Sequence, residues 1–265
     1  MLLHLKQKLG TAISLIRQQS TKVAINTNLN GYESLRVDAD FIEKPEDAAA
    51  IVVLQEWWGF NTEIRNQAQN LADRGYVTLI PDLYRGKVAL NVAEAQRLLA
   101  GLDWGIAVKD IHAAIDYLRS TNPNRKVGLV GFGLGGALAF LAASAACTPE
   151  QRIDCAISFF GLPPSHICND LVQSGVPIQG HFELLEEHLE YSNGRAARSF
   201  EKKLKEAGSE HEPFHYHDPQ QDGSVRISPW YEEAIVDKSV TLEPAWSPAL
   251  AFLDQHLIQV PPSRM

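Results

Sequence analysis

Two kinds of hydrophobic pattern alternate along this chain of 265 residues. Short apolar runs rich in β-branched residues predict buried strands, and stretches with apolar residues every three or four positions predict helices. Strands are expected at 48–54, 76–81, 155–160, 178–182 and 212–216, with a strand–turn–helix unit at 126–143. Further helices are expected at 64–74, 91–99, 108–119, 194–207 and 247–257.

The order of these elements indicates the fold class. Strands that alternate with helices of about ten or more residues are typical of βαβ units, in which helices cover both faces of a parallel sheet. We therefore expect an α/β fold with a mostly parallel central sheet. The regular pattern starts near Ser34, so we expect one domain over 31–260, preceded by an N-terminal extension over 1–30.

The unit at 126–143 has the glycine spacing of a nucleophile elbow. In the G-x-S-x-G form of this turn, the middle residue lies at the strained tip between strand and helix and presents a nucleophilic side chain above the sheet. Here Gly131 and Gly135 flank the tip, and the tip is Gly133. The spacing predicts the turn, but its tip has no side chain for nucleophilic attack.

Four sequence blocks in order give the chain a specific resemblance. They are LQEWWG at 54–59, IRNQAQNLADRGYVTLIPDLYRGK at 64–87, VGLVGFGLGG at 127–136 and PIQGHF at 177–182. Over roughly 35–258 the chain resembles the dienelactone hydrolase family. The resemblance implies an α/β-hydrolase fold. Family members hydrolyse small lactones or esters with an elbow Cys or Ser, an Asp and a His, and the Glu of their QE motif lies near the resting thiol.

The family's catalytic positions are mostly changed in this chain. The nucleophile position is Gly133, and the acid position falls on or near Glu186, which is still a carboxylate. The histidine position falls on Gln221 or, with one residue of slip, on Asp222. A triad needs a base to take the nucleophile's proton and a carboxylate to orient that base. We therefore expect no intact triad and no catalysis of ester hydrolysis by it.

Four other residues are candidates for a pocket beside the elbow. Glu56 is expected to be a pocket carboxylate with a raised pKa, the alternative being a solvated loop residue. Trp57 would line a ligand cavity or belong to the core. The backbone N–H of Leu134 would still point to the oxyanion position. Arg85 would meet an anionic ligand at the pocket mouth or remain a solvated loop arginine.

Three histidines, His211, His215 and His217, lie close together near the expected catalytic corner. If they lie on a strand, His215 and His217 share a face and Tyr216 points the other way. Metal ligation is the less favoured interpretation, because no carboxylate with matching spacing accompanies them. His181 in the GHF block is expected to be structural. We expect no metal and no cofactor.

Charge and composition exclude several classes of partner and site. The net charge of −8 argues against nucleic acid as the main partner. The cysteines at 147, 155 and 168 form no CxxC pair and suggest neither a disulfide framework nor a zinc site. No apolar run reaches the roughly 18 residues that span a bilayer.

The first 30 residues have the composition of a targeting segment. They carry four basic residues and no acidic one, and their apolar residues recur at helical spacing, at positions 2, 5, 9, 13 and 16. The alternative is a plain helix that packs on the domain or on a neighbour. Mitochondrial targeting is the expectation, with a cytoplasmic location otherwise.

Two functions from different classes remain. In the first, the chain is a catalytically inactive structural or interaction subunit of a larger assembly. In the second, it is a hydrolase of small esters or lactones that activates water with Glu56 or Glu186. Binding of a small carboxylate or carbonyl ligand is a further alternative.

Overall fold

The computed structural model describes residues 20–25, 32–37, 48–146, 152–184, 194–218 and 243–258. Its strands are β1 (Ser20–Ile25), β2 (Tyr32–Val37), β3 (Ala50–Leu54), β4 (Val77–Pro81), β5 (Val127–Phe132), β6 (Cys155–Phe159), β7 (Ile178–Glu183) and β8 (His215–His217). Its helices are α2 (Thr62–Ala72), α3 (Val92–Ala100), α4 (Trp104–Thr121), α5 (Leu134–Ser144), α6 (Cys168–Ser174), α7 (Gly194–Glu206) and α8 (Glu243–Leu257), with a short 3-10 helix η2 (Ser165–Ile167).

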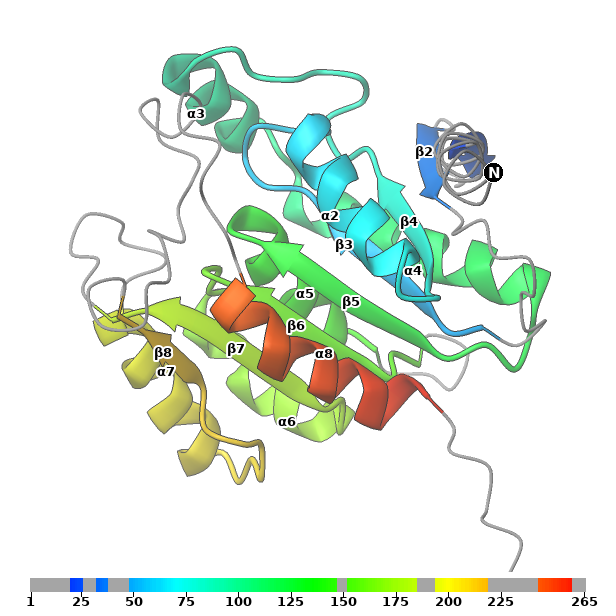
Figure 1. Cartoon of the computed structure of the whole chain (residues 1–265). Coiled ribbons are helices and arrows are strands. Elements are labelled where there is room, and N and C mark those ends of the chain that lie inside the picture. The colour runs from blue at the N-terminus through cyan, green and yellow to red at the C-terminus, as the bar shows by residue number, and fades with distance from the viewer. Residues whose placement is uncertain are drawn as a thin grey trace, which may run out of the picture.

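The strands form one sheet in the order β1-β2-β4-β3-β5-β6-β7-β8 (Figure 1). Strands β3 to β8 are parallel where they pair, whereas β2 is antiparallel to both β1 and β4. The expected α/β fold with a mostly parallel sheet is therefore confirmed.

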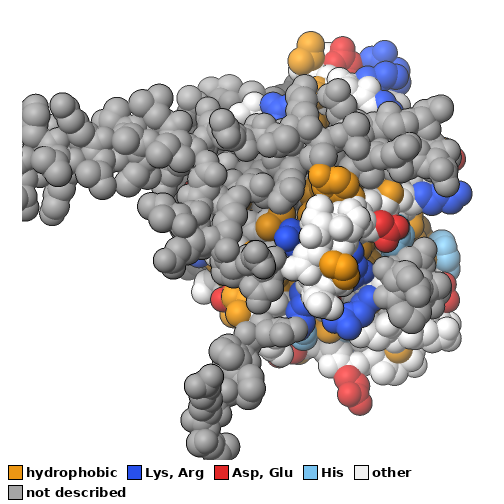
Figure 2. All heavy atoms as spheres, turned by 90° about the vertical axis from the view of Figure 1, so that its right-hand side faces the viewer, with side chains coloured by type: hydrophobic (Ala, Val, Ile, Leu, Met, Phe, Trp, Pro, Cys, Tyr) orange, Lys and Arg blue, Asp and Glu red, His pale blue; other side chains and the backbone are white. Residues whose placement is uncertain are grey.

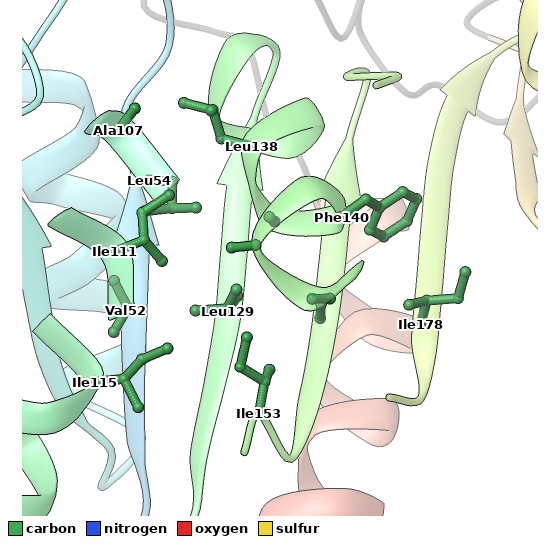
Figure 3. Close-up of a cluster of buried hydrophobic side chains, with 14 of the residues drawn as sticks. Val52, Leu54, Ala107, Ile111, Ile115, Leu129, Leu138, Phe140, Ile153 and Ile178 are labelled. Carbon is green, nitrogen blue, oxygen red and sulfur yellow. The ribbon is translucent and has the colours of Figure 1, made fainter. Parts of the chain in front are cut away.

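Two hydrophobic layers cover the sheet, one on each face. On β3, Val52 and Leu54 belong to the layer that contains residues of α4, α5, α6 and α7, and Figure 3 shows part of that layer. The alternate residues Ile51 and Val53 belong to the layer that contains residues of α2 and α8. Strand β3 has no exposed face, which explains why its sequence is a continuous apolar run.

The sheet starts earlier in the chain than the expected boundary at 31. Strand β1 lies within the stretch 1–30 and pairs in register from Ser20↔Val37 to Ile25↔Tyr32. The sequence of β1, STKVAI, places Thr21, Val23 and Ile25 at alternate positions, a period of two that the helical spacing upstream obscures. Residues 1–19 lie outside the described part of the chain.

Capping residues account for the helix starts that the periodicity placed imprecisely. Helix α4 begins at Trp104, not at 108, because the Asp103 side chain accepts a hydrogen bond from the backbone N–H of Ile106. Helix α2 begins at Thr62, not at 64, because Asn61 caps Ile64 in the same way at 3.1 Å. Among the described helices, none is both long and apolar enough to cross a bilayer.

Candidate active site

The turn between β5 and α5 has the conformation of a nucleophile elbow. Gly133 has φ 49° and ψ −112°, a backbone conformation that favours glycine, and its N–H donates to the carbonyl oxygen of Phe159 at 2.7 Å. The flanking glycines are needed for close packing. A Cβ on Gly131 would lie 2.0 Å from the carbonyl oxygen of Gly135, and one on Gly135 would lie 2.4 Å from that of Leu54.

The carboxyl group of Glu56 occupies the space at the tip of this turn. A Cβ on Gly133 would lie 1.9 Å from Glu56 Oε1 and 2.6 Å from its Cδ. Glu56 Oε1 also accepts a hydrogen bond from the backbone N–H of Leu134 at 3.1 Å. The structure therefore brings together three residues that the sequence singled out, and the predicted oxyanion donor is bound to a carboxyl group of the same chain.

Burial changes the acidity of Glu56. The residue is only 8% exposed, and this burial raises the pKa of its carboxyl from an ordinary 4.5 to about 8, although hydrogen bonds from the backbone of Leu134 and Trp57 lower it. Glu56 is thus a buried carboxyl with a raised pKa, as its place in the QEWWG block predicts.

Tyr84 is a residue of this site that the sequence interpretation missed. It lies in the loop after β4, is 6% exposed, and has no hydrogen-bond partner for its hydroxyl among the described residues. Burial and, after it, the nearby Glu56 carboxyl raise the pKa of Tyr84. The signal was available, because the DLY sequence follows β4 and the carboxyl ends of neighbouring parallel strands meet at one edge of the sheet.

Hydrogen bonds from two side chains shape the loop that carries Tyr84. Asp82 accepts from the backbone N–H groups of Tyr84 at 3.2 Å and of Gly86 at 2.5 Å. Gln55 Oε1 accepts from the N–H of Leu83 at 3.2 Å. This second bond ties the loop after β4 to the residue that precedes Glu56, so the two halves of the site are held together.

Contacts within the protein fix the position of the Arg85 side chain. Its Nη2 lies 2.5 Å from Oδ2 of Asp110, a buried residue of α4, and its Nη1 donates to the carbonyl oxygen of Asp82 at 3.2 Å. Arg85 therefore makes an ion pair with the protein, and both residues border a cavity of about 700 Å³ between this loop, α3 and α4. Apolar side chains contribute to its wall, among them those of Leu83, Val88, Leu98 and Ile106.

The tryptophans of QEWWG contact the core. Trp57 is half-buried and packs against the hydrophobic layer of α4 and α5, and its ring meets that of Trp58 edge to face at 5.5 Å. Glu186, Gln221 and Asp222, the remaining triad positions, lie outside the described residues.

The histidines of β8 stack against β7. His181 Nδ1 lies 3.1 Å from His217 Nε2, its Nε2 lies 2.9 Å from Gln179 Oε1, and the rings of His181 and His215 stack at 4.8 Å. Burial, followed by the two neighbouring histidines, lowers the pKa of His181. Both ring nitrogens of His181 thus have partners within the protein.

The face of β8 that carries Tyr216 is opposite to that of His215 and His217, as expected, because the Tyr216 hydroxyl donates to Glu201 of α7 at 2.9 Å. His211 instead contacts Ser209, with 2.7 Å between its Nδ1 and the hydroxyl oxygen. Within the described ranges, no group of three or more His, Cys, Asp or Glu side chains could hold a metal ion.

Comparisons with known proteins agree on one family. Residues 38–257 match the model of the dienelactone hydrolase family. A carboxymethylenebutenolidase from Pseudomonas putida is 36% identical over 125 residues, which are 43% of this chain and 51% of the relative. The chain thus spans about half the length of the curated relatives it matches.

Solved structures support the same fold. A dienelactone hydrolase-like promiscuous phosphotriesterase from metagenomic libraries has a TM-score of 0.70 at 15% identity, covering 90% of this chain and 98% of its own. A dienelactone hydrolase from Anabaena variabilis has a TM-score of 0.60 at 18% identity, covering 91% and 99%. Sequence match, fold and elbow geometry together lead to one conclusion: this chain belongs to the dienelactone hydrolase family.

Proposed function

We propose that this chain is a non-hydrolytic member of its family and serves as a structural or interaction subunit of a larger assembly. The observation that carries the proposal is the position of the Glu56 carboxyl at the tip of the elbow. It lies where a nucleophile's side chain would begin, 1.9 Å from a Cβ built on Gly133, and it accepts the hydrogen bond of Leu134 that an oxyanion would need.

One observation favours the alternative of a hydrolase with an unusual site. A pKa of about 8 for Glu56 is close to the value that suits a general base near neutral pH. Against this, the backbone N–H of Leu134 is not free to stabilise an oxyanion, because it donates a hydrogen bond to Oε1 of Glu56. Activation of water by Glu56 would therefore be separated from the stabilisation that makes such chemistry fast.

Turnover measurements separate the two functions. We expect the purified chain to hydrolyse 4-nitrophenyl acetate and dihydrocoumarin no faster than a heat-inactivated sample between pH 6 and 9. Saturable hydrolysis that disappears in Glu56→Gln would show that the carboxyl is a base and would refute the non-hydrolytic proposal. Turnover that Glu56→Gln leaves unchanged but Glu186→Gln removes would refute the proposal equally, and turnover that neither variant changes would point to a contaminating esterase.

The subunit part of the proposal rests on the loss of the nucleophile and on the N-terminal segment. A fold that has lost the nucleophile can be kept for binding, because function belongs to sites on a fold. Figure 2 shows the face on the side of β2, where apolar, basic and acidic side chains of the described residues are interspersed. Residues 1–19 add a basic amphipathic pattern, and we propose that they direct mitochondrial import or contact a neighbouring subunit.

Deletion of residues 1–19 tests this part, because it removes the amphipathic segment and retains β1. We expect the shortened chain to keep the thermal transition of the full chain and to lose its co-purifying partners or its organelle location. A matched control replaces Lys6, Lys8 and Arg17 by Gln and keeps the apolar spacing. If the full chain is a free cytosolic monomer without co-purifying protein, the subunit proposal is wrong.

A further inference from the structure

A second cavity lies at the edge of the sheet opposite to the elbow. Its volume is about 560 Å³, and Val176, Pro177 and Ile178 border it where β7 begins. The elbow follows the last residue of β5, and β5, β6 and β7 run parallel. The elbow and this cavity are therefore at opposite ends of the strands, and neither Glu56 nor Gly133 borders the cavity.

The loop after α7 forms one wall of this cavity. Helix α7 is followed by Gly208 with φ 92°, and the N–H of Ser209 donates to the carbonyl oxygen of Leu204 at 2.9 Å. Together with the bond from Gly208 to Lys205 at 3.0 Å, this is the hydrogen-bond pattern of a Schellman motif. The motif ends the helix and turns the chain, so that 208–212 border the cavity.

The charge of the wall favours a cation. Glu210 and Glu212 border the cavity with exposed carboxylates, and no Lys or Arg of the described residues borders it. Two histidines, His211 and His256, also belong to the wall. Burial is the main cause that lowers the pKa of each histidine below its ordinary 6.5. At pH 7.5 both rings are therefore neutral and leave the two negative charges uncompensated.

The wall also contains a nitrogen atom that lacks a hydrogen bond. Nε2 of His211 is buried and has no partner among the described residues. Nδ1 of the same ring lies 2.7 Å from the hydroxyl oxygen of Ser209. We assign the ring proton to Nδ1, where it donates to this oxygen, so that Nε2 is an acceptor. Buried polar groups are almost always hydrogen-bonded, and this acceptor indicates that a donor binds in the cavity.

We propose that this cavity binds a small primary amine in its ammonium form, attached to an apolar body. An ammonium group has three donors, and the wall offers three acceptors, namely Nε2 of His211 and the carboxylates of Glu210 and Glu212. The apolar body packs against side chains such as those of Ile178 and Phe252, which border the same cavity. A cavity of this size, with a few polar groups on an apolar wall, suits a small organic ligand.

A metal ion is the less favoured cation. Histidine and carboxylate side chains are common ligands of Zn²⁺, but across the ranges that the structure describes no three of them are arranged to hold a metal ion. The apolar part of the wall, with Leu171, Val172 and Leu204, also has no role in binding a hydrated ion. The wall therefore fits an organic cation better.

Benzylamine tests the site in the full chain at pH 7.5, with benzyl alcohol as its neutral analogue and benzoate as its anionic one. Binding is followed through the amide resonances of the 15N-labelled chain in an NMR titration. We expect benzylamine to shift the resonances of 208–212 saturably and to leave those of 131–135 at the elbow unchanged. Benzyl alcohol should bind about tenfold more weakly, because it lacks the ion pairs, and benzoate more weakly still.

Two variants separate the charge from the hydrogen bond. Replacing both carboxylates, Glu210→Gln with Glu212→Gln, should weaken benzylamine binding about fivefold and leave that of benzyl alcohol unchanged. His211→Ala should weaken benzylamine binding about fivefold through the loss of one hydrogen bond. The matched control, Glu63→Gln with Asp73→Asn, removes two exposed charges of the α2 region, away from the cavity, and should bind benzylamine like the unmodified chain.

Four results would overturn the inference: no saturable binding of benzylamine, binding of benzoate as tight as that of benzylamine, shifts at 131–135 in place of 208–212, or unchanged binding in both the double Gln variant and His211→Ala. Stoichiometric binding of Zn²⁺ that displaces benzylamine would overturn it as well, because the cavity would then be a metal site. None of these results depends on whether the chain hydrolyses esters, since the elbow lies at the other edge of the sheet.

Discussion

Replacing Gly133 by Ala measures how closely Glu56 fits the elbow. Adding a Cβ at this position destabilises the fold in two ways. The first is the backbone: at φ 49° a residue with a Cβ is strained by about 1–3 kcal/mol. The second is the contact at 1.9 Å with Glu56 Oε1. Because that oxygen ends a rotatable side chain, the carboxyl can move away, and its displacement costs about 1 kcal/mol for the lost hydrogen bond to Leu134.

The total loss in the free energy of unfolding should therefore be about 2–4 kcal/mol, measured by urea denaturation at pH 6. A double-mutant cycle separates the two costs. In a Glu56→Ala background the contact is absent, so Gly133→Ala should cost only the backbone strain, and the coupling between the two positions should be about 1 kcal/mol.

Gly175 supplies the matched control for strain alone. It has φ 65°, and an added Cβ would meet nothing within 4 Å, so Gly175→Ala should cost about 1 kcal/mol with no dependence on Glu56. A neutral Gly133→Ala would show that the turn is relaxed in solution. Strictly additive effects of Gly133→Ala and Glu56→Ala would show that the carboxyl does not lie at the tip.

Two further predictions follow from charged groups. Glu56 has its pKa raised to about 8 in the folded chain, so the folded state holds a proton that the unfolded state releases above pH 4.5. The free energy of unfolding should therefore fall by about 1.4 kcal/mol per pH unit between roughly pH 5 and 8, relative to that of Glu56→Gln. Parallel urea midpoints of the two proteins across that range would contradict this. Arg85→Met breaks the 2.5 Å ion pair with buried Asp110 and should lower the free energy of unfolding by about 1–2 kcal/mol at pH 7. The loss should shrink at pH 4, where Asp110, whose pKa burial raises, begins to protonate, and an equal loss at both pH values would mean that the pair contributes only packing.

The central elements could be predicted because local and tertiary preferences agree there. Buried parallel strands such as β3 and β5 are continuous apolar runs, and the glycine spacing at 131, 133 and 135 predicted the turn that joins β5 to α5. Strand β1 could not be placed, because a short strand with alternating residues is stabilised by pairing with β2, a partner that its own pattern does not reveal.

The site was predictable only as far as motif positions fix it. The QEWWG block placed Glu56 beside the elbow, and the turn placed the N–H of Leu134. The hydrogen bond between them was not predictable, because it depends on the rotamer of Glu56 and on the space left by a missing side chain at Gly133. The DLY sequence after β4 could have placed Tyr84 at the same edge of the sheet as Glu56, but no sequence feature shows whether a tyrosine hydroxyl in such a loop is buried or exposed.

The order of the strands in the sheet also bears on how the chain folds. Strands β1 and β2 are neighbours in sequence and pair with each other, so their contacts close only a short loop. Strand β5, in contrast, pairs with β3 across α2, β4, α3 and α4, and this long-range pairing brings Glu56, which follows β3, to the elbow that follows β5. Long loops must lose entropy before such contacts reward them. The contact between Glu56 and the elbow depends on the pairing of β3 with β5, so we expect it to form later in folding than the local contacts between β1 and β2.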